Sequence, residues 1–213
     1  MEPLRWPVVL FDLDGTLANS IDLVVASYRA AFATIGRGVE RDAALRWIGE
    51  TLRQTFAREA PGHGPEMEVA YRAYYADHID QIGGYPGVPE LLASLNDAGA
   101  VTGVVTAKKR EVALVTMRQA GVEGLIELLG AMEDTAAHKP DPEPLLAAAA
   151  KLGVTPGTCV YVGDATYDVM AAKAAGMAVT AVTWGAGQPS ELAALNPTAL
   201  VNDAEELKAC LFG

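Results

Sequence analysis

The sequence of 213 residues is poor in cysteine, in basic residues and in long apolar segments. The two cysteines, Cys159 and Cys210, are too few for a disulfide framework, and we expect both to be free thiols in a reducing compartment. No apolar run reaches the roughly 18 residues that a membrane-spanning helix needs, and the first residues lack the pattern of a secretory signal. We therefore expect a soluble, cytoplasmic protein with no membrane partner.

Positive charge is also scarce. Lysine and arginine number 16 against 27 aspartate and glutamate residues, which gives a formal net charge of −11. This excess of negative charge argues against nucleic acid and anionic membrane surfaces as partners. It leaves an anionic small molecule open, because a bound cation can reverse the sign of the potential inside a pocket.

The first chemically distinctive stretch lies near the start of the chain. Residues Val8–Phe11 form an apolar run that predicts a strand buried on both faces of a parallel sheet. Asp12 and Asp14 follow at once, and Gly15 and Thr16 come next. Two carboxylates at the end of a buried strand repel each other, so either a divalent cation lies between them or one stays protonated. The alternative is an acidic turn that merely ends the strand.

Two patterns divide the rest of the chain. Residues 17–83 carry helical periodicity only, whereas residues 84–213 alternate short apolar runs with helical segments. Such alternation favours right-handed crossovers and a doubly wound parallel sheet. We predict an α/β core, residues 1–16 and 84–213, with an inserted helical cap, residues 17–83. The expected strands are 8–11, 101–105, 128–132, 159–162, 177–182 and 200–201, and the expected helices include 21–35, 66–82, 108–120 and 142–152.

Polar residues at the strand ends are the candidate functional residues. In sheets of this kind, ligands bind beyond the carboxyl ends of the strands. Asp164 follows the expected strand 159–162, and Asp168 lies one helical turn further on, so the two carboxylates can share a face. The complete set of candidates is Asp12, Asp14, Thr106, Lys139, Asp164 and Asp168.

These residues resemble the motifs of a known family. Asp12-Leu13-Asp14-Gly15-Thr16, Thr106, Lys139 and Gly163–Asp168 are similar, in order and spacing, to the four motifs of the haloacid dehalogenase (HAD) superfamily. The helical insertion after the first motif resembles the C1 cap of subfamily I. The segments Tyr85–Val88 and Lys139–Pro142 resemble the phosphoglycolate phosphatase-like branch.

The resemblance implies a phosphatase that hydrolyses a small phosphate ester, with phosphoglycolate as the branch-level substrate. Asp12 would be the nucleophile that forms an aspartyl-phosphate, and Asp14 the general acid and base. The phosphoryl group would be bound by Thr106, by Lys139 and by the main-chain N–H groups near Leu13 and Ala107, and Lys108 is a further candidate for substrate contact.

The same resemblance implies Mg²⁺ as the cofactor. The ion would be held by Asp12, by the main-chain carbonyl of Asp14 and by Asp164, with waters at other positions. Asp168 would orient those waters or bond Lys139. The loop near Gly49, with Glu50, Thr51 and Arg53, is our candidate specificity patch.

Several alternatives stay open. A pyrophosphatase or a sugar phosphomutase would use the same fold, and a non-catalytic binding or regulatory protein could be built on it. Asp14 argues against a dehalogenase, because dehalogenases of this fold lack the second aspartate. The chain has Asn19-Ser20 and Ala107 where the branch often has Asp-Ser and asparagine, which leaves the leaving group in doubt. The oligomeric state, monomer or homodimer, cannot be deduced from the sequence.

Overall fold

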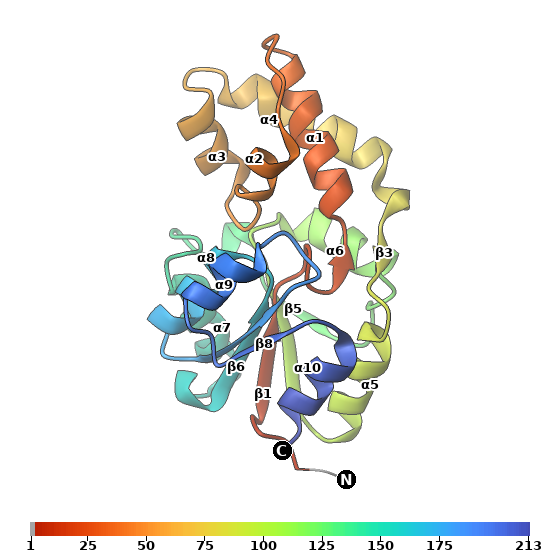
Figure 1. Ribbon diagram of the computed structural model, residues 1–213, viewed down its shortest axis with the longest axis vertical. Coiled ribbons are helices and arrows are strands. Elements are labelled where there is room, and N and C mark those ends of the chain that lie inside the picture. Colours follow the sequence, from red (N-terminus) through yellow and green to blue (C-terminus); the bar gives the residue numbers. More distant parts are fainter. Residues whose placement is uncertain (1–2) are drawn as a thin grey trace.

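The computed structural model describes residues 3–213 and is built around one parallel sheet (Figure 1). The strand order is β5-β4-β1-β6-β7-β8, and every neighbouring pair is parallel. The doubly wound α/β fold expected from the sequence is confirmed. The strands are β1 (Val8–Phe11), β4 (Val101–Val105), β5 (Glu127–Gly130), β6 (Cys159–Gly163), β7 (Ala178–Val182) and β8 (Ala199–Val201).

Helices cover both faces of this sheet. Alternate residues of β1 point to opposite faces, so Val9 and Phe11 join one apolar cluster while Val8 and Leu10 join the other. Each cluster is closed by its own set of helices, which explains the continuous apolar run of the strand. One set is α5 (Val88–Asp97), α6 (Arg110–Gln119) and α10 (Ala204–Leu211), and the other is α7 (Glu143–Leu152), α8 (Thr166–Ala174) and α9 (Pro189–Ala194).

A second group of helices lies beyond the carboxyl ends of the strands (Figure 1). Its core is aromatic: the Tyr28 ring meets the rings of Trp47, Phe56 and Tyr71 edge to face, and Phe32 stacks on Trp47 with 5.2 Å between centroids. We call this group the cap. It comprises α1 (Ile21–Ala33), α2 (Arg41–Leu45), α3 (Leu52–Glu59), α4 (Gly64–Asp77) and the 3₁₀ helix η1 (Ile79–Gln81).

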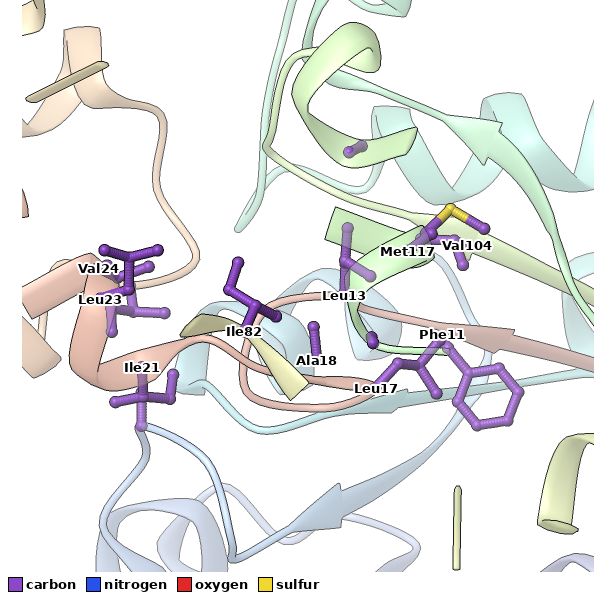
Figure 2. Packing of buried hydrophobic residues seen from close by; sticks show 14 of the residues in the cluster. Phe11, Leu13, Leu17, Ala18, Ile21, Leu23, Val24, Ile82, Val104 and Met117 are labelled. Atoms are coloured by element: carbon purple, nitrogen blue, oxygen red, sulfur yellow. The ribbon is translucent and has the colours of Figure 1, made fainter. Parts of the chain in front are cut away.

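The chain leaves the core and returns to it at one place. Two short strands, β2 (Ala18–Asn19) and β3 (Gly83–Gly84), pair antiparallel there, and the sequence did not predict them. Leu17 and Ile82 on either side of the crossing are buried in one cluster with Phe11 (Figure 2). The domain boundaries at residues 17 and 83 stay a prediction.

Several predicted ends need correction. The helix expected over 66–82 begins at Gly64, because Pro65 fits the first turn, and it ends at Asp77. The helix expected from residue 108 begins at Arg110, since the Lys108 N–H bonds Thr106 Oγ1 and Lys109 is extended. The strand expected over 128–132 ends at Gly130.

Two other expectations concern thiols and membrane spans. Cys159 and Cys210 are both free, as predicted, although only Cys159 is buried. Among the helices of residues 3–213, none combines the length and apolar character needed to cross a membrane.

Removing one ring from the cap core tests whether the cap is a packed unit. Phe32 is fully buried, so Phe32→Ala should lower the free energy of unfolding by about 3–5 kcal/mol. Val69 on α4 is 69% exposed, and Val69→Ala should change the free energy of unfolding by no more than about 0.5 kcal/mol. Urea unfolding measures both values, and equal losses would contradict a packed cap core.

Candidate functional site

The carboxyl ends of two neighbouring strands, β1 and β6, bring three of the predicted acidic residues together. Asp12 follows β1, Asp164 follows β6, and Asp168 lies in the first turn of α8. Carboxylate oxygens of the three residues lie within 4.8 Å of one another. Their side chains are buried, with Asp164 and Asp168 fully inaccessible. The cluster is therefore a concentration of buried negative charge, with Asp12 at the wall of a cavity.

Lys139 supplies the positive charge of this cluster. Its Nζ donates to Asp12 Oδ1 at 2.8 Å, to Asp168 Oδ1 at 2.6 Å and to the Tyr161 hydroxyl at 3.0 Å. Burial alone would lower the pKa of Lys139, but Asp12 and Asp168 raise that pKa well above its ordinary value. Lys139 is thus a fixed cation with all three of its protons engaged.

The Tyr161 hydroxyl fixes this lysine from the other side. It donates to the main-chain carbonyl of Val105 at 2.8 Å and accepts from Lys139. Tyr161 was missed by sequence reasoning. The sequence marks Tyr161 only as a polar hydroxyl in the otherwise apolar strand β6. This does not indicate that the hydroxyl contacts Lys139.

The Asp164 carboxylate is held by groups from two separate segments. Its Oδ1 accepts from Thr16 Oγ1 at 2.8 Å, and its Oδ2 accepts from the main-chain N–H of Ala186 at 2.7 Å. A Cβ at Gly15 or at Gly185 would overlap this carboxylate, so both positions require glycine. Burial, together with the charges of Asp168 and Asp12, raises the pKa of Asp164 well above its ordinary value.

The charge of the cluster fits a divalent cation. Three carboxylates against one ammonium leave about two negative charges uncompensated when all are ionised, and the donors are oxygens, the type that hard cations prefer. Asp168 already accepts from Lys139 and from the Ala165 N–H. Asp164 likewise accepts on both oxygens, so within residues 3–213 Asp12 Oδ2 is the one carboxylate oxygen of the three residues without a hydrogen bond. Metal contact by Asp12, Asp164, Asp168 or the Asp14 carbonyl stays a prediction.

Asp14 lies outside that cluster and has different partners. Its Oδ1 accepts from Ser20 Oγ at 2.5 Å and from Lys108 Nζ at 2.6 Å. Ser20 was expected as a possible helix cap. It does hold the N-cap position of α1, but its hydroxyl serves Asp14 instead. Burial alone would lower the pKa of Lys108, but Asp14 and Tyr75 raise it.

The remaining predicted residues for phosphoryl binding are Thr106 and the main-chain N–H groups of Leu13 and Ala107. Thr106 is buried and its Oγ1 accepts from the Lys108 N–H at 3.2 Å. Within residues 3–213, no backbone or side-chain acceptor takes a hydrogen bond from the main-chain N–H of Leu13 or of Ala107. The Leu13 side chain itself is buried in the core. Free N–H donors beside a buried carboxylate match the predicted phosphoryl-binding role, which stays a prediction.

A cavity of about 530 Å³ lies between the core and the cap. Asp12, Asp14 and Thr106 line its base, and three cations, Arg72, Lys108 and Lys109, also reach it. Most of the other lining side chains are apolar or aromatic: Val24, Tyr28, Ile48, Leu52, Tyr71, Tyr75, Ala76, Ile79, Val112, Val115 and Met132.

The candidate specificity patch is only partly at this cavity. Gly49 and Glu50 line it. Thr51 instead caps α3 through a capping box with Gln54. Arg53 is exposed and is absent from the cavity lining, so it does not face the site in this structure.

Adding one methyl group beside Asp164 tests the packing of the site. Gly185→Ala should lower the free energy of unfolding by roughly 1–3 kcal/mol, because the new Cβ overlaps a buried carboxylate. At Gly38 no atom lies within 4 Å of an added Cβ, so Gly38→Ala is the matched control and should be nearly neutral. Chemical denaturation gives both values. Two neutral substitutions would show that the Asp164 surroundings are loosely packed.

The chain is similar to known proteins along most of its length. Residues 9–182 match the family model of haloacid dehalogenase-like hydrolases. A pyrophosphatase PpaX from Bacillus velezensis is 32% identical over 209 residues, covering 97% of each chain, and one from Bacillus pumilus is 35% identical over 178 residues, covering 83% of this chain and 82% of its own.

A solved structure adds agreement in three dimensions. The crystal structure of a predicted phosphoglycolate phosphatase from Haemophilus somnus superposes with a TM-score of 0.83 at 25% identity, covering 96% of this chain and 98% of that one. The family match spans most of the chain and includes Asp12, Thr106, Lys139 and Asp164. The chain therefore belongs to the haloacid dehalogenase-like hydrolases.

Proposed function

We propose that this protein is a Mg²⁺-dependent phosphatase that hydrolyses a small phosphomonoester through an aspartyl-phosphate on Asp12. The observation that carries the proposal is the position of Asp12. Its carboxylate lines the cavity, one of its oxygens is bonded to Lys139, and the unbonded N–H groups of Leu13 and Ala107 belong to the residues next to Asp12 and Thr106.

In the first step, a carboxylate oxygen of Asp12 attacks phosphorus, and the bond from phosphorus to the leaving oxygen breaks. Asp14 donates a proton to that oxygen. In the second step, water attacks phosphorus, gives a proton to Asp14, and the bond to Asp12 breaks to release phosphate. Ser20 and Lys108 hold the Asp14 carboxylate for both transfers.

The surrounding residues stabilise the charge that develops on the phosphoryl oxygens. Lys139 offers a full positive charge in a region of low dielectric constant, and the Thr106 hydroxyl and the N–H groups of Leu13 and Ala107 offer hydrogen-bond donors. Asp12, Asp164 and the carbonyl of Asp14 would hold Mg²⁺, which when bound neutralises phosphoryl charge. Asp168 keeps Lys139 in place.

Pyrophosphate hydrolysis is the second candidate function. The curated relatives named above are pyrophosphatases, whereas the solved neighbour is described as a phosphoglycolate phosphatase. Both reactions would use Asp12 as the nucleophile and differ only in the leaving group. A sugar phosphomutase would return the phosphoryl group to a second hydroxyl, so phosphate release into water separates it from either hydrolase.

Removing the nucleophile tests the proposed function. Wild-type protein should release phosphate from small esters when Mg²⁺ is present and stop when a chelator is added. Asp12→Asn should lower the rate by at least about 10⁴-fold, because no covalent intermediate can form. Asp97→Asn, at an exposed position on α5, is the control and should keep the wild-type rate. Undiminished turnover by Asp12→Asn would exclude the mechanism.

Removing a single hydroxyl tests the positioning of Lys139. Tyr161→Phe deletes the bond to Lys139 and keeps the ring, so kcat should fall by about tenfold while KM stays close to the wild-type value. If Tyr161 had only a structural role, the substitution would lower the stability of the protein without lowering kcat at constant KM. Tyr74→Phe, at a half-buried cap tyrosine, serves as the control. An unchanged kcat in Tyr161→Phe would remove Tyr161 from the mechanism.

A further inference from the structure

We propose that the leaving group of the substrate is uncharged and largely apolar, and larger than a glycolate or a second phosphate. This inference rests on the proposed phosphatase activity and concerns the cavity above Asp12. Neither the pyrophosphatase relatives nor the phosphoglycolate phosphatase neighbour has a name that describes such a substrate.

The first argument is the pattern of exposed apolar side chains. Leu52, Ile79, Val112, Val115 and Met132 are each only half-buried, and all five line this one cavity. They come from both the cap and the core: from α3, η1, α6 and the 3₁₀ helix η2 (Met132–Asp134). Half-buried aliphatic groups from separate elements that converge on a concave site are typical of a surface that an apolar ligand covers.

The second argument is the shortage of available positive charge. Lys108 has three protons, and these already meet Asp14 at 2.6 Å, Tyr75 at 2.5 Å and Thr116 at 3.3 Å. Its ammonium group therefore has no donor left for a second anionic group. This lysine is the nearest cavity cation to the acid-base residue, where the leaving group would emerge.

The other two cations of the cavity, Arg72 and Lys109, share its lining with carboxylates. Arg72 is bonded to Glu68 at 3.2 Å. Lys109 makes no ion pair within residues 3–213. The cavity lining as a whole nevertheless holds four carboxylates against three cations: Asp12, Asp14, Glu50 and Glu111 against Arg72, Lys108 and Lys109. A carboxylate or a second phosphoryl group would have to lose its hydration here with little compensation.

The third argument is size. A cavity of 530 Å³ lies within the range of about 300–1,000 Å³ that accommodates drug-sized ligands. Phosphoglycolate and pyrophosphate are much smaller than such a ligand, and part of each molecule would lie at the phosphoryl position near Asp12. The remaining space is bounded mainly by aliphatic and aromatic side chains, so an apolar group of several carbons fills it best.

A series of n-alkyl phosphates from methyl to hexyl tests the proposal, with phosphoglycolate and pyrophosphate measured beside it. The leaving alcohols have nearly equal basicity, so changes in kcat/KM along the series report burial of the chain and not its reactivity. We expect kcat/KM to rise by up to about fourfold for each added methylene. We also expect hexyl phosphate to exceed both phosphoglycolate and pyrophosphate.

Neighbouring residues on α6 provide the matched variants. Val115 lines the cavity, and Val115→Asp should lower the hexyl-to-methyl ratio of kcat/KM by at least about tenfold, because a carboxylate replaces the apolar contact. Leu114 is 45% exposed and does not line the cavity, so Leu114→Asp should leave the ratio unchanged. Val115→Ser, a milder change, should lower the ratio in the same direction if Val115→Asp fails to fold.

The outcomes separate this inference from the proposed function. A flat alkyl series with pyrophosphate or phosphoglycolate as the fastest substrate would overturn the apolar leaving group and leave the phosphatase intact. An equal loss of the ratio in the Leu114 and Val115 variants would overturn the assignment of the cavity wall. No Mg²⁺-dependent phosphate release from any compound would overturn the proposed function, and this inference with it.

Discussion

A buried ammonium group held between two carboxylates is the interaction on which the polar end of the sheet depends. Lys139 is 1% exposed and its partners, Asp12 and Asp168, are buried with it. Removing Lys139 would leave both buried carboxylates without their cation, which costs several kcal/mol. Because these residues come from the end of β1, from α8 and from a loop between them, this pairing requires that all three segments keep their relative positions. The ion pairs of Lys139 therefore hold the segments of the fold together and also fix the positions of the candidate site residues.

The sequence predicted the parts of the site that the topology of the sheet decides. Parallel strands end at the same edge, so polar residues that follow apolar runs, such as Asp12 and Asp164, must meet. Lys139 lies in a loop, and only its likeness to a family motif identified it. The contacts of Tyr161 and Tyr75 could not be predicted, because they depend on how β6 faces α7 and α8 and on where the cap rests. No periodicity in the sequence contains that information.

The cavity joins two surfaces of opposite character. Its base is made of strand ends and carries most of the charge, in surroundings where electrostatic forces are weakly screened. Much of its roof is made of cap helices and is mainly apolar. The division has a physical origin, since strand ends in a rigid sheet can hold a few atoms accurately, whereas helix faces offer broad surfaces for packing. Most charged groups of the cavity thus come from the core, whereas its apolar lining comes from both the cap and the core.

The antiparallel pair of β2 and β3 determines how the cap could be replaced by another inserted segment. Since Ala18 pairs with Gly84 and Asn19 with Gly83, the inserted segment begins and ends one strand spacing apart, about 4.8 Å. Any insert whose own ends meet at that spacing could replace the helices between them without moving a strand of the sheet. The core therefore offers a fixed insertion point, defined by the two residue pairs of β2 and β3. A new cap grafted at these two pairs would place new helices over an unchanged set of candidate catalytic residues.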